Sequence, residues 1–167
     1  MTQYDVTKEH ERREEELADF VSRHWKCVCK LQRKFSIFDA VARAKESQIP
    51  RAFIEFRIVN YSYDGLPEIM IPMSKLILGK QQTEMTGVAS LFMVHWYKCK
   101  TIGYVDVNNI ECIPDYRVTF MGMNRTNNKE EIEVCRFVPR EIFTILRRGH
   151  EPDRTETLPE TREAEEE

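Results

Sequence analysis

The sequence predicts an α/β fold in which helices pack against a mixed β-sheet. Two observations lead to this prediction. Segments with helical spacing and segments with strand alternation follow the order helix, three strands, helix, two strands and trailing strands. The first of the two strands predicted within residues 88–107 is nearly all apolar, which is typical of a central strand covered on both faces.

The N-terminal part begins with a predicted helix at residues 7–24, where apolar residues recur at helical spacing. Residues 25–32 and 35–42 are predicted strands, and a polar connector leads to a third strand at residues 52–60. Alternate residues of a strand face opposite sides. The third strand therefore has an apolar face and a partly charged face: Ala52, Ile54, Phe56 and Ile58 against Phe53, Glu55, Arg57 and Val59.

The C-terminal part continues with a predicted turn at residues 61–68 and a helix at residues 71–87 that ends at a glycine. Two strands follow within residues 88–107, on either side of a Lys-Cys-Lys turn. Late strands are predicted within residues 116–139, and residues 140–148 are expected to form a short helical end.

The composition bounds the domain organisation and the class of protein. The 167 residues suit one domain, at residues 1–149, followed by an acidic disordered tail at residues 150–167. Although the net charge is −3, the body without this tail is basic, which is compatible with nucleic-acid binding. The N-terminus has no signal-peptide core and no segment could span a membrane, so we expect a cytoplasmic protein. The spacing of cysteines and histidines does not favour a zinc site.

Two carboxylates stand in otherwise apolar strand segments. Asp39 interrupts the second predicted strand, although Asp is disfavoured there, and Glu55 shares a strand face with Arg57. If the two strands pair as a hairpin, the carboxylates repel each other unless a cation such as Mg²⁺ lies between them. Simpler interpretations stay open: Arg57 is the partner of Glu55 or their face is exposed, and Asp39 faces water at a strand edge.

A third carboxylate, Glu14, lies on the helical stripe formed with Leu17, Ala18 and Val21. If this stripe packs on the sheet, Glu14 is delivered to the other two carboxylates. The alternative is that Glu14 only stabilises the early helix through its interaction with the helix dipole.

The helix with an inward Glu, the strand, FDAVA (38–42), the polar turn and AFIEFR (52–57) together resemble the PD-(D/E)xK nuclease superfamily. Residues 70–107 look like the helix, apolar strand and hairpin that follow the motif in phage-encoded members, and the similarity covers roughly residues 10–145. The resemblance implies a restriction-endonuclease-like mixed β-sheet with flanking helices and an α-β-β-β-α-β core, as in Holliday-junction-resolvase-like proteins.

Position by position, the resemblance implies that Asp39, Glu55 and the Phe56 carbonyl hold Mg²⁺ or Mn²⁺. Glu14 would match the glutamate of the family's helix.

The family's motif lysine is replaced here by Arg57, which can stabilise charge but does not readily release a proton. Some members carry the lysine on the following helix, where Lys75 stands in this chain. Lys75 is otherwise interpreted as an ordinary exposed lysine.

These residues predict a Mg²⁺-dependent DNA endonuclease that hydrolyses phosphodiester bonds, with phage DNA processing as the implied setting. The expected partners are DNA and a second copy of the chain or a phage protein complex, in the host cytoplasm or associated with the virion. Basic residues near the predicted strand ends would contact phosphates or simply favour solubility: Arg33, Lys34, Arg43, Lys45, Arg51, Lys98 and Lys100.

Two other classes of function stay open. A catalytically impaired module with the nuclease fold would bind DNA, or build a phage particle or a DNA-processing complex. A plain interaction domain would use the acidic tail as its contact.

Overall fold

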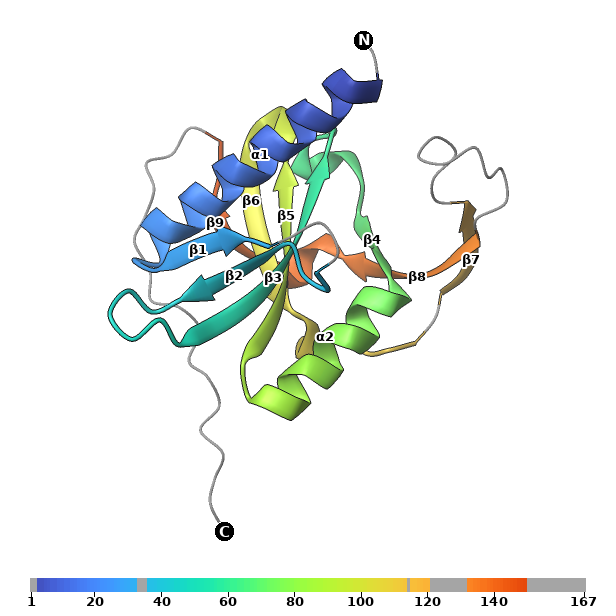
Figure 1. Cartoon of the computed structure of the whole chain (residues 1–167). Coiled ribbons are helices and arrows are strands. Elements are labelled where there is room, and N and C mark those ends of the chain that lie inside the picture. Colours follow the sequence, from blue (N-terminus) through green and yellow to red (C-terminus); the bar gives the residue numbers. More distant parts are fainter. Residues whose placement is uncertain (1–2, 33–35, 114, 121–131, 150–167) are drawn as a thin grey trace.

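The computed structural model describes residues 3–32, 36–113, 115–120 and 132–149 (Figure 1). The predicted acidic tail lies outside the described residues, as do Arg33 and Lys34 of the predicted phosphate contacts. Within the described part, no helix is long and apolar enough to cross a membrane.

Six strands of the described residues form the main sheet, in the order β1-β2-β3-β5-β6-β9. Strands β3 and β5 are parallel and every other neighbouring pair is antiparallel, so the sheet is mixed, as predicted. The bounds of these strands are β1 Val28–Leu31, β2 Ala40–Arg43, β3 Pro50–Val59, β5 Ala89–Trp96, β6 Thr101–Asp106 and β9 Thr144–Arg147. Every residue of β5 is buried, which confirms its predicted central place.

Two helices cover opposite faces of this sheet (Figure 1). Helix α1 (Gln3–His24) packs its apolar stripe against Ile54, Leu91 and Met93. Helix α2 (Met73–Thr86) packs on the other face, where alternate β5 residues such as Phe92 point. For the helices and the strands of the main sheet, the predicted order of one helix, three strands, a second helix and a central strand is confirmed.

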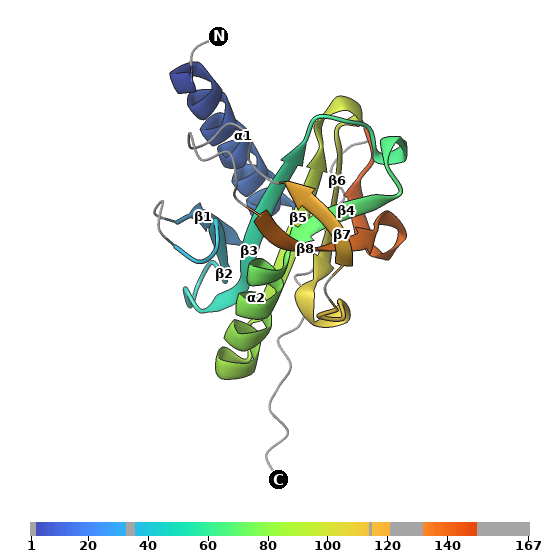
Figure 2. The same ribbon diagram turned by 90° about the vertical axis from the view of Figure 1, so that its right-hand side faces the viewer.

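A smaller sheet lies to one side of the main sheet and consists of β4, β8 and β7 in that order (Figure 2). Its strands are β4 Glu68–Pro72, β7 Asp115–Phe120 and β8 Ile132–Pro139, all antiparallel to their neighbours. The late strands β7 and β8 confirm the prediction. Strand β4 was not predicted, because the predicted turn ended at residue 68, the predicted helix began at residue 71, and residues 69–70 were assigned to neither.

The second helix has nearly the predicted bounds, since it begins at Met73 and ends at Thr86. Gly87 follows with a left-handed φ of 69°, and its N–H donates to the Thr83 carbonyl over 2.8 Å. The predicted glycine stop is therefore confirmed, and a side chain at position 87 would strain this backbone.

The predicted short helical end at residues 140–148 is wrong. Only Arg140–Ile142 form a 3₁₀ turn, and Thr144–Arg147 are strand β9. Strand β9 pairs antiparallel with β6 and buries Leu146 in the core under α1. Pairing with the open edge of β6 satisfies the backbone groups of both strands, which a single helical turn would leave without partners.

Candidate active site

Asp39 lies immediately before β2 rather than inside a strand, which corrects the predicted strand at residues 35–42. The β2–β3 ladder ends at the pair Ala40 and Ile54, and β3 continues beyond it. There the Asp39 carboxylate accepts a hydrogen bond from the Phe56 backbone N–H, with 2.8 Å between Oδ2 and N. The side chain of Asp39 therefore takes the place of a strand residue opposite Phe56.

The same hydrogen bond shows where the backbone of Phe56 points. In an extended strand, the N–H and C=O of one residue point toward the same neighbouring strand. Since the Phe56 N–H meets Asp39, the Phe56 carbonyl faces the same edge, next to the Asp39 carboxylate. The Phe56 side chain is buried in the core under α1, so the contribution of this residue to the site is its backbone.

Glu55 projects from the opposite face of β3 to the Phe56 side chain, and its side chain is 15 % exposed. Lys75, from the first turn of α2, donates a hydrogen bond to Glu55 Oε2 over 2.9 Å and forms an ion pair with Oε1 at 2.9 Å. The same ammonium also donates to the Ile37 carbonyl over 3.1 Å. Lys75 therefore links α2, β3 and the segment that carries Asp39.

The charge of Asp39 acts on Glu55. Burial raises the pKa of Asp39, and the Phe56 N–H partly opposes this shift. Burial and the nearby charge of Asp39 raise the pKa of Glu55 to about 7, although Lys75 opposes the increase. Because the pair resists carrying two negative charges, the site favours a cation.

Glu14 lies on α1 within electrostatic range of this pair. Its charge raises the pKa of both Asp39 and Glu55. The described contact of its carboxylate is with His10 Nε2, at 2.9 Å. Residues on the predicted stripe, including Leu17 and Val21, are buried against the sheet. Helix α1 thus brings Glu14 toward the two carboxylates without a direct hydrogen bond to either in the described contacts.

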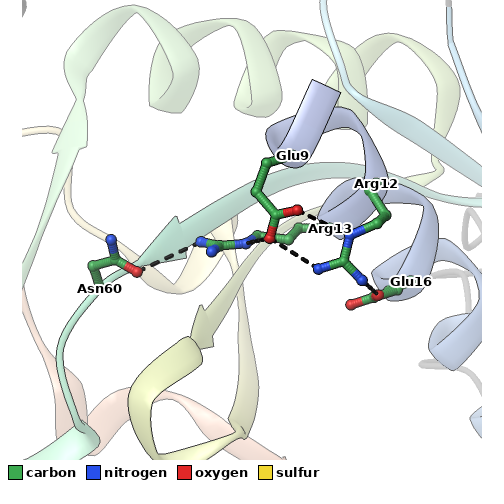
Figure 3. Close-up of polar contacts among 5 residues, drawn as sticks. All are labelled: Glu9, Arg12, Arg13, Glu16 and Asn60. Atoms are coloured by element: carbon green, nitrogen blue, oxygen red, sulfur yellow. Dashed lines mark hydrogen bonds and ion pairs between the residues drawn. The ribbon is translucent and has the colours of Figure 1, made fainter. Parts of the chain in front are cut away.

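A charge network anchors the start of α1 to the sheet (Figure 3). The Glu9 carboxylate accepts hydrogen bonds from Arg12 and Arg13, and Arg12 also pairs with Glu16. Arg13 reaches Asn60 beyond the end of β3, with 3.5 Å between Nη1 and Oδ1. Its guanidinium also lies 3.8 Å from the ring centroid of Tyr97. These contacts fix the helical turn that carries Glu14.

Arg57 shares the face of β3 that carries Glu55, two residues further along the strand. Its charge acts on Tyr61, whose pKa is raised by burial and lowered in part by Arg57. Of the two cations considered for the position of the motif lysine, Lys75 has a described contact with Glu55.

The donor atoms fit a hard divalent cation. No group of three His, Cys, Asp or Glu side chains among the described residues is arranged to hold a metal ion. Mg²⁺, however, is usually bound by only one or two carboxylates, and water and substrate phosphate complete its coordination. Two carboxylates and the Phe56 carbonyl are oxygen donors of this kind.

Sequence reasoning missed two contributors to this site. The Ile37 carbonyl, which holds Lys75, is a backbone atom and leaves no signal in the sequence. His10 contacts Glu14, and its spacing of four residues along the helix was an available signal. Of the predicted basic contacts, Arg43, Lys45 and Arg51 lie around the β2–β3 connection, at the other end of β2 from Asp39.

No protein-family model and no curated protein sequence matches the chain. Among solved structures, the chain is similar to D212, a nuclease from a fusselovirus. The TM-score is 0.47 and the identity 14 %, and the alignment covers 87 % of this chain and 89 % of the other.

Proposed function

We propose that this chain is a DNA endonuclease that hydrolyses phosphodiester bonds with Mg²⁺ or Mn²⁺. One observation carries the proposal: Asp39 lies where β2 and β3 separate, its charge raises the pKa of Glu55, and Lys75 binds Glu55 there. Phage DNA processing is the setting implied by the resemblance to phage-encoded members.

In this proposal, Asp39, Glu55 and the Phe56 carbonyl hold the divalent metal ion. When bound, such an ion supplies a Lewis acid for the scissile phosphate and lowers the pKa of a coordinated water. The hydrogen bond from the Phe56 N–H keeps the Asp39 carboxylate oriented.

Lys75 replaces the motif lysine in this proposal. Its ammonium already lies against the Glu55 carboxylate and is positioned to stabilise the negative charge that develops on the phosphate oxygens. A lysine, unlike an arginine, can also release a proton, so Lys75 is able to assist in activating water. Arg57, which lies on the same strand face as Glu55, binds a phosphate through bidentate hydrogen bonds from its guanidinium.

In this proposal, Glu14 adds a third carboxylate to the site and His10 positions it. The charge of Glu14 adds to the negative potential at Asp39 and Glu55, which favours a cation. His10 holds the Glu14 carboxylate toward α1.

The first test is nicking of supercoiled plasmid DNA in the presence of Mg²⁺ or Mn²⁺. Wild type is compared with Asp39→Asn and Glu55→Gln, which remove charge at nearly constant shape. Glu46→Gln is the matched control, because Glu46 is an exposed carboxylate in the β2–β3 connection, away from Asp39. We expect cleavage by wild type and the control, and loss of cleavage in both site variants and in the presence of a chelator.

Binding of Mn²⁺, measured by calorimetry in the absence of DNA, separates the alternatives. Binding that depends on Asp39 and Glu55, without cleavage of any DNA form, would indicate the impaired nuclease-fold module. Wild type that neither binds the metal nor cleaves DNA would contradict the proposal.

A further inference from the structure

A cavity of about 260 Å³ lies between α1 and the part of the main sheet formed by β5, β6 and β9. It opens on the face of the sheet that α1 covers, and none of the proposed active-site residues lines it. Its apolar wall includes Phe20 of α1 and Ile102 of β6. Its polar wall consists of Glu16, Asp19, Arg23, His95 and Arg147.

His95 is the unusual member of this wall. It is 6 % exposed, and neither of its ring nitrogens has a hydrogen-bond partner among the described residues. Its described aromatic contact is edge-to-face with Tyr97, which satisfies neither nitrogen. Buried polar groups are nearly always hydrogen-bonded, so an imidazole without a protein partner indicates a partner inside the cavity.

The surroundings of His95 are electropositive. The pKa of His95 is lowered to about 4, mainly by burial and then by the charges of Arg147 and Arg13. Arg147 is oriented by the Lys100 carbonyl, which accepts from its Nε over 3.3 Å, and lies over the ring of Phe20 at 5.1 Å.

The wall also contains two carboxylates. Glu16 is paired with Arg12, and Asp19 is exposed to solvent. Arg23, from the last turn of α1, adds a second guanidinium to the wall.

We propose that this cavity binds a tetrahedral oxyanion, either inorganic phosphate or the phosphate of a mononucleotide, through His95 and Arg147. A guanidinium donates charge-assisted hydrogen bonds to such an anion, and the imidazole supplies a further donor. A water molecule takes about 30 Å³ of liquid volume, so the cavity has room for the anion and several waters.

The binding is coupled to protonation of His95. A bound anion stabilises the imidazolium against Arg147 and Arg13, so the pKa of His95 rises from about 4 when the anion binds. The affinity for an anion of constant charge therefore increases as the pH falls. Glu16 and Asp19 also favour the imidazolium, whereas Arg23 opposes it.

The test uses the whole chain and follows the histidine ring signals by ¹⁵N-edited NMR. The probes are sulfate, inorganic phosphate, thymidine 5′-monophosphate and thymidine. The variants are His95→Gln and Arg147→Gln. Arg148→Gln is the matched control, because Arg148 is the next residue along the chain and does not line the cavity. Circular dichroism checks that each variant is folded.

We expect saturable binding of sulfate and phosphate with a shift of the His95 signals toward the protonated form. Each cavity variant should bind roughly tenfold or more weakly, as expected for the loss of one charge-assisted hydrogen bond, and Arg148→Gln should bind like wild type. Tighter binding of the monophosphate than of phosphate identifies a nucleotide as the source, and equal binding identifies the free anion.

Three results would overturn the proposal: no binding of any oxyanion at millimolar concentration, equal affinity for thymidine and its monophosphate, or unchanged affinity in Arg147→Gln. If both cavity variants unfold, wild type still decides the question. The affinity of wild type for sulfate must increase as the pH is lowered from about 7.5 to about 5.5. A constant affinity would contradict the role of His95.

Discussion

The candidate active site and the cavity beside His95 both bury titratable groups, but only the active site places opposing partners beside them. There, neighbouring carboxylates add to the effect of burial on the pKa of Asp39 and Glu55, whereas the Phe56 N–H and Lys75 oppose it. At the cavity, Arg147 and Arg13 reinforce the effect of burial on His95. The two carboxylates therefore become charged readily when a cation binds beside them, whereas His95 stays neutral until an anion binds.

The largest expected effect is on the rate of catalysis at the candidate active site. We expect Lys75→Ala to lower the rate of plasmid nicking by about 100-fold or more, because it removes a charge that stabilises the transition state. Lys80→Ala is the matched control on the same helix and should nick like wild type, since no described contact joins Lys80 to the carboxylates. Equal losses in the two variants would assign the effect to general charge rather than to the site.

Removing the Glu55 charge should change how stability depends on pH. In the folded protein the pKa of Glu55 is about 7, against an ordinary 4.5. A raised carboxyl pKa means that the folded state binds more protons than the unfolded state. Below about pH 4.5, Glu55 therefore does not lower the free energy of unfolding. Above pH 7 it lowers the free energy of unfolding by its full amount, on the order of 3 kcal/mol. Without divalent metal, Glu55→Gln should therefore be more stable than wild type at pH 8 and similar at low pH.

Urea unfolding in the presence of a chelator, across this pH range, measures the difference. Glu46→Gln should follow the wild-type curve, because that carboxylate is exposed. Added Mg²⁺ should stabilise wild type at pH 8 and leave Glu55→Gln nearly unchanged. Parallel curves for wild type and Glu55→Gln would show that Lys75 fully compensates the buried charge.

The smallest expected effect concerns the cavity. Replacing His95 by Phe removes two buried nitrogens that lack described partners, and we expect a gain of about 1 kcal/mol in the free energy of unfolding in anion-free buffer. Sulfate should then stabilise wild type but not this variant. A loss of stability in His95→Phe would indicate that His95 is already satisfied in the protein without an anion, which would remove the contrast between the two regions.

The local patterns of the sequence were sufficient for most of the main sheet. The all-apolar segment of β5 predicted a central strand, and the alternation at residues 52–60 correctly placed Glu55 and Arg57 on one face. The glycine stop of α2 was also predictable, because a left-handed backbone conformation favours glycine. These features depend on near neighbours along the chain.

The errors occurred where partners distant in sequence decide the conformation. A short apolar run such as residues 142–146 fits both a helix and a strand, and the open edge of β6 makes it a strand. Likewise, β4 has its sheet partner far along the chain, because it pairs with β8 at Ile132–Pro139. Asp39 was predicted inside a strand, but its side chain completes the pairing of β3 from outside one.

The sequence by itself determined the order of the helices and strands from α1 to β6, β4 excepted, and the strand face that carries charge, because these follow from periodicity and backbone preference. Only the tertiary structure decided which charges meet. Lys75 reaches Glu55 because α2 packs against β5, the parallel neighbour of β3, and Asp39 reaches Phe56 because β2 begins only after Asp39. The cavity at His95 likewise exists only where α1 crosses the sheet. A periodic pattern specifies a face, but the packing of helices on the sheet specifies what that face touches.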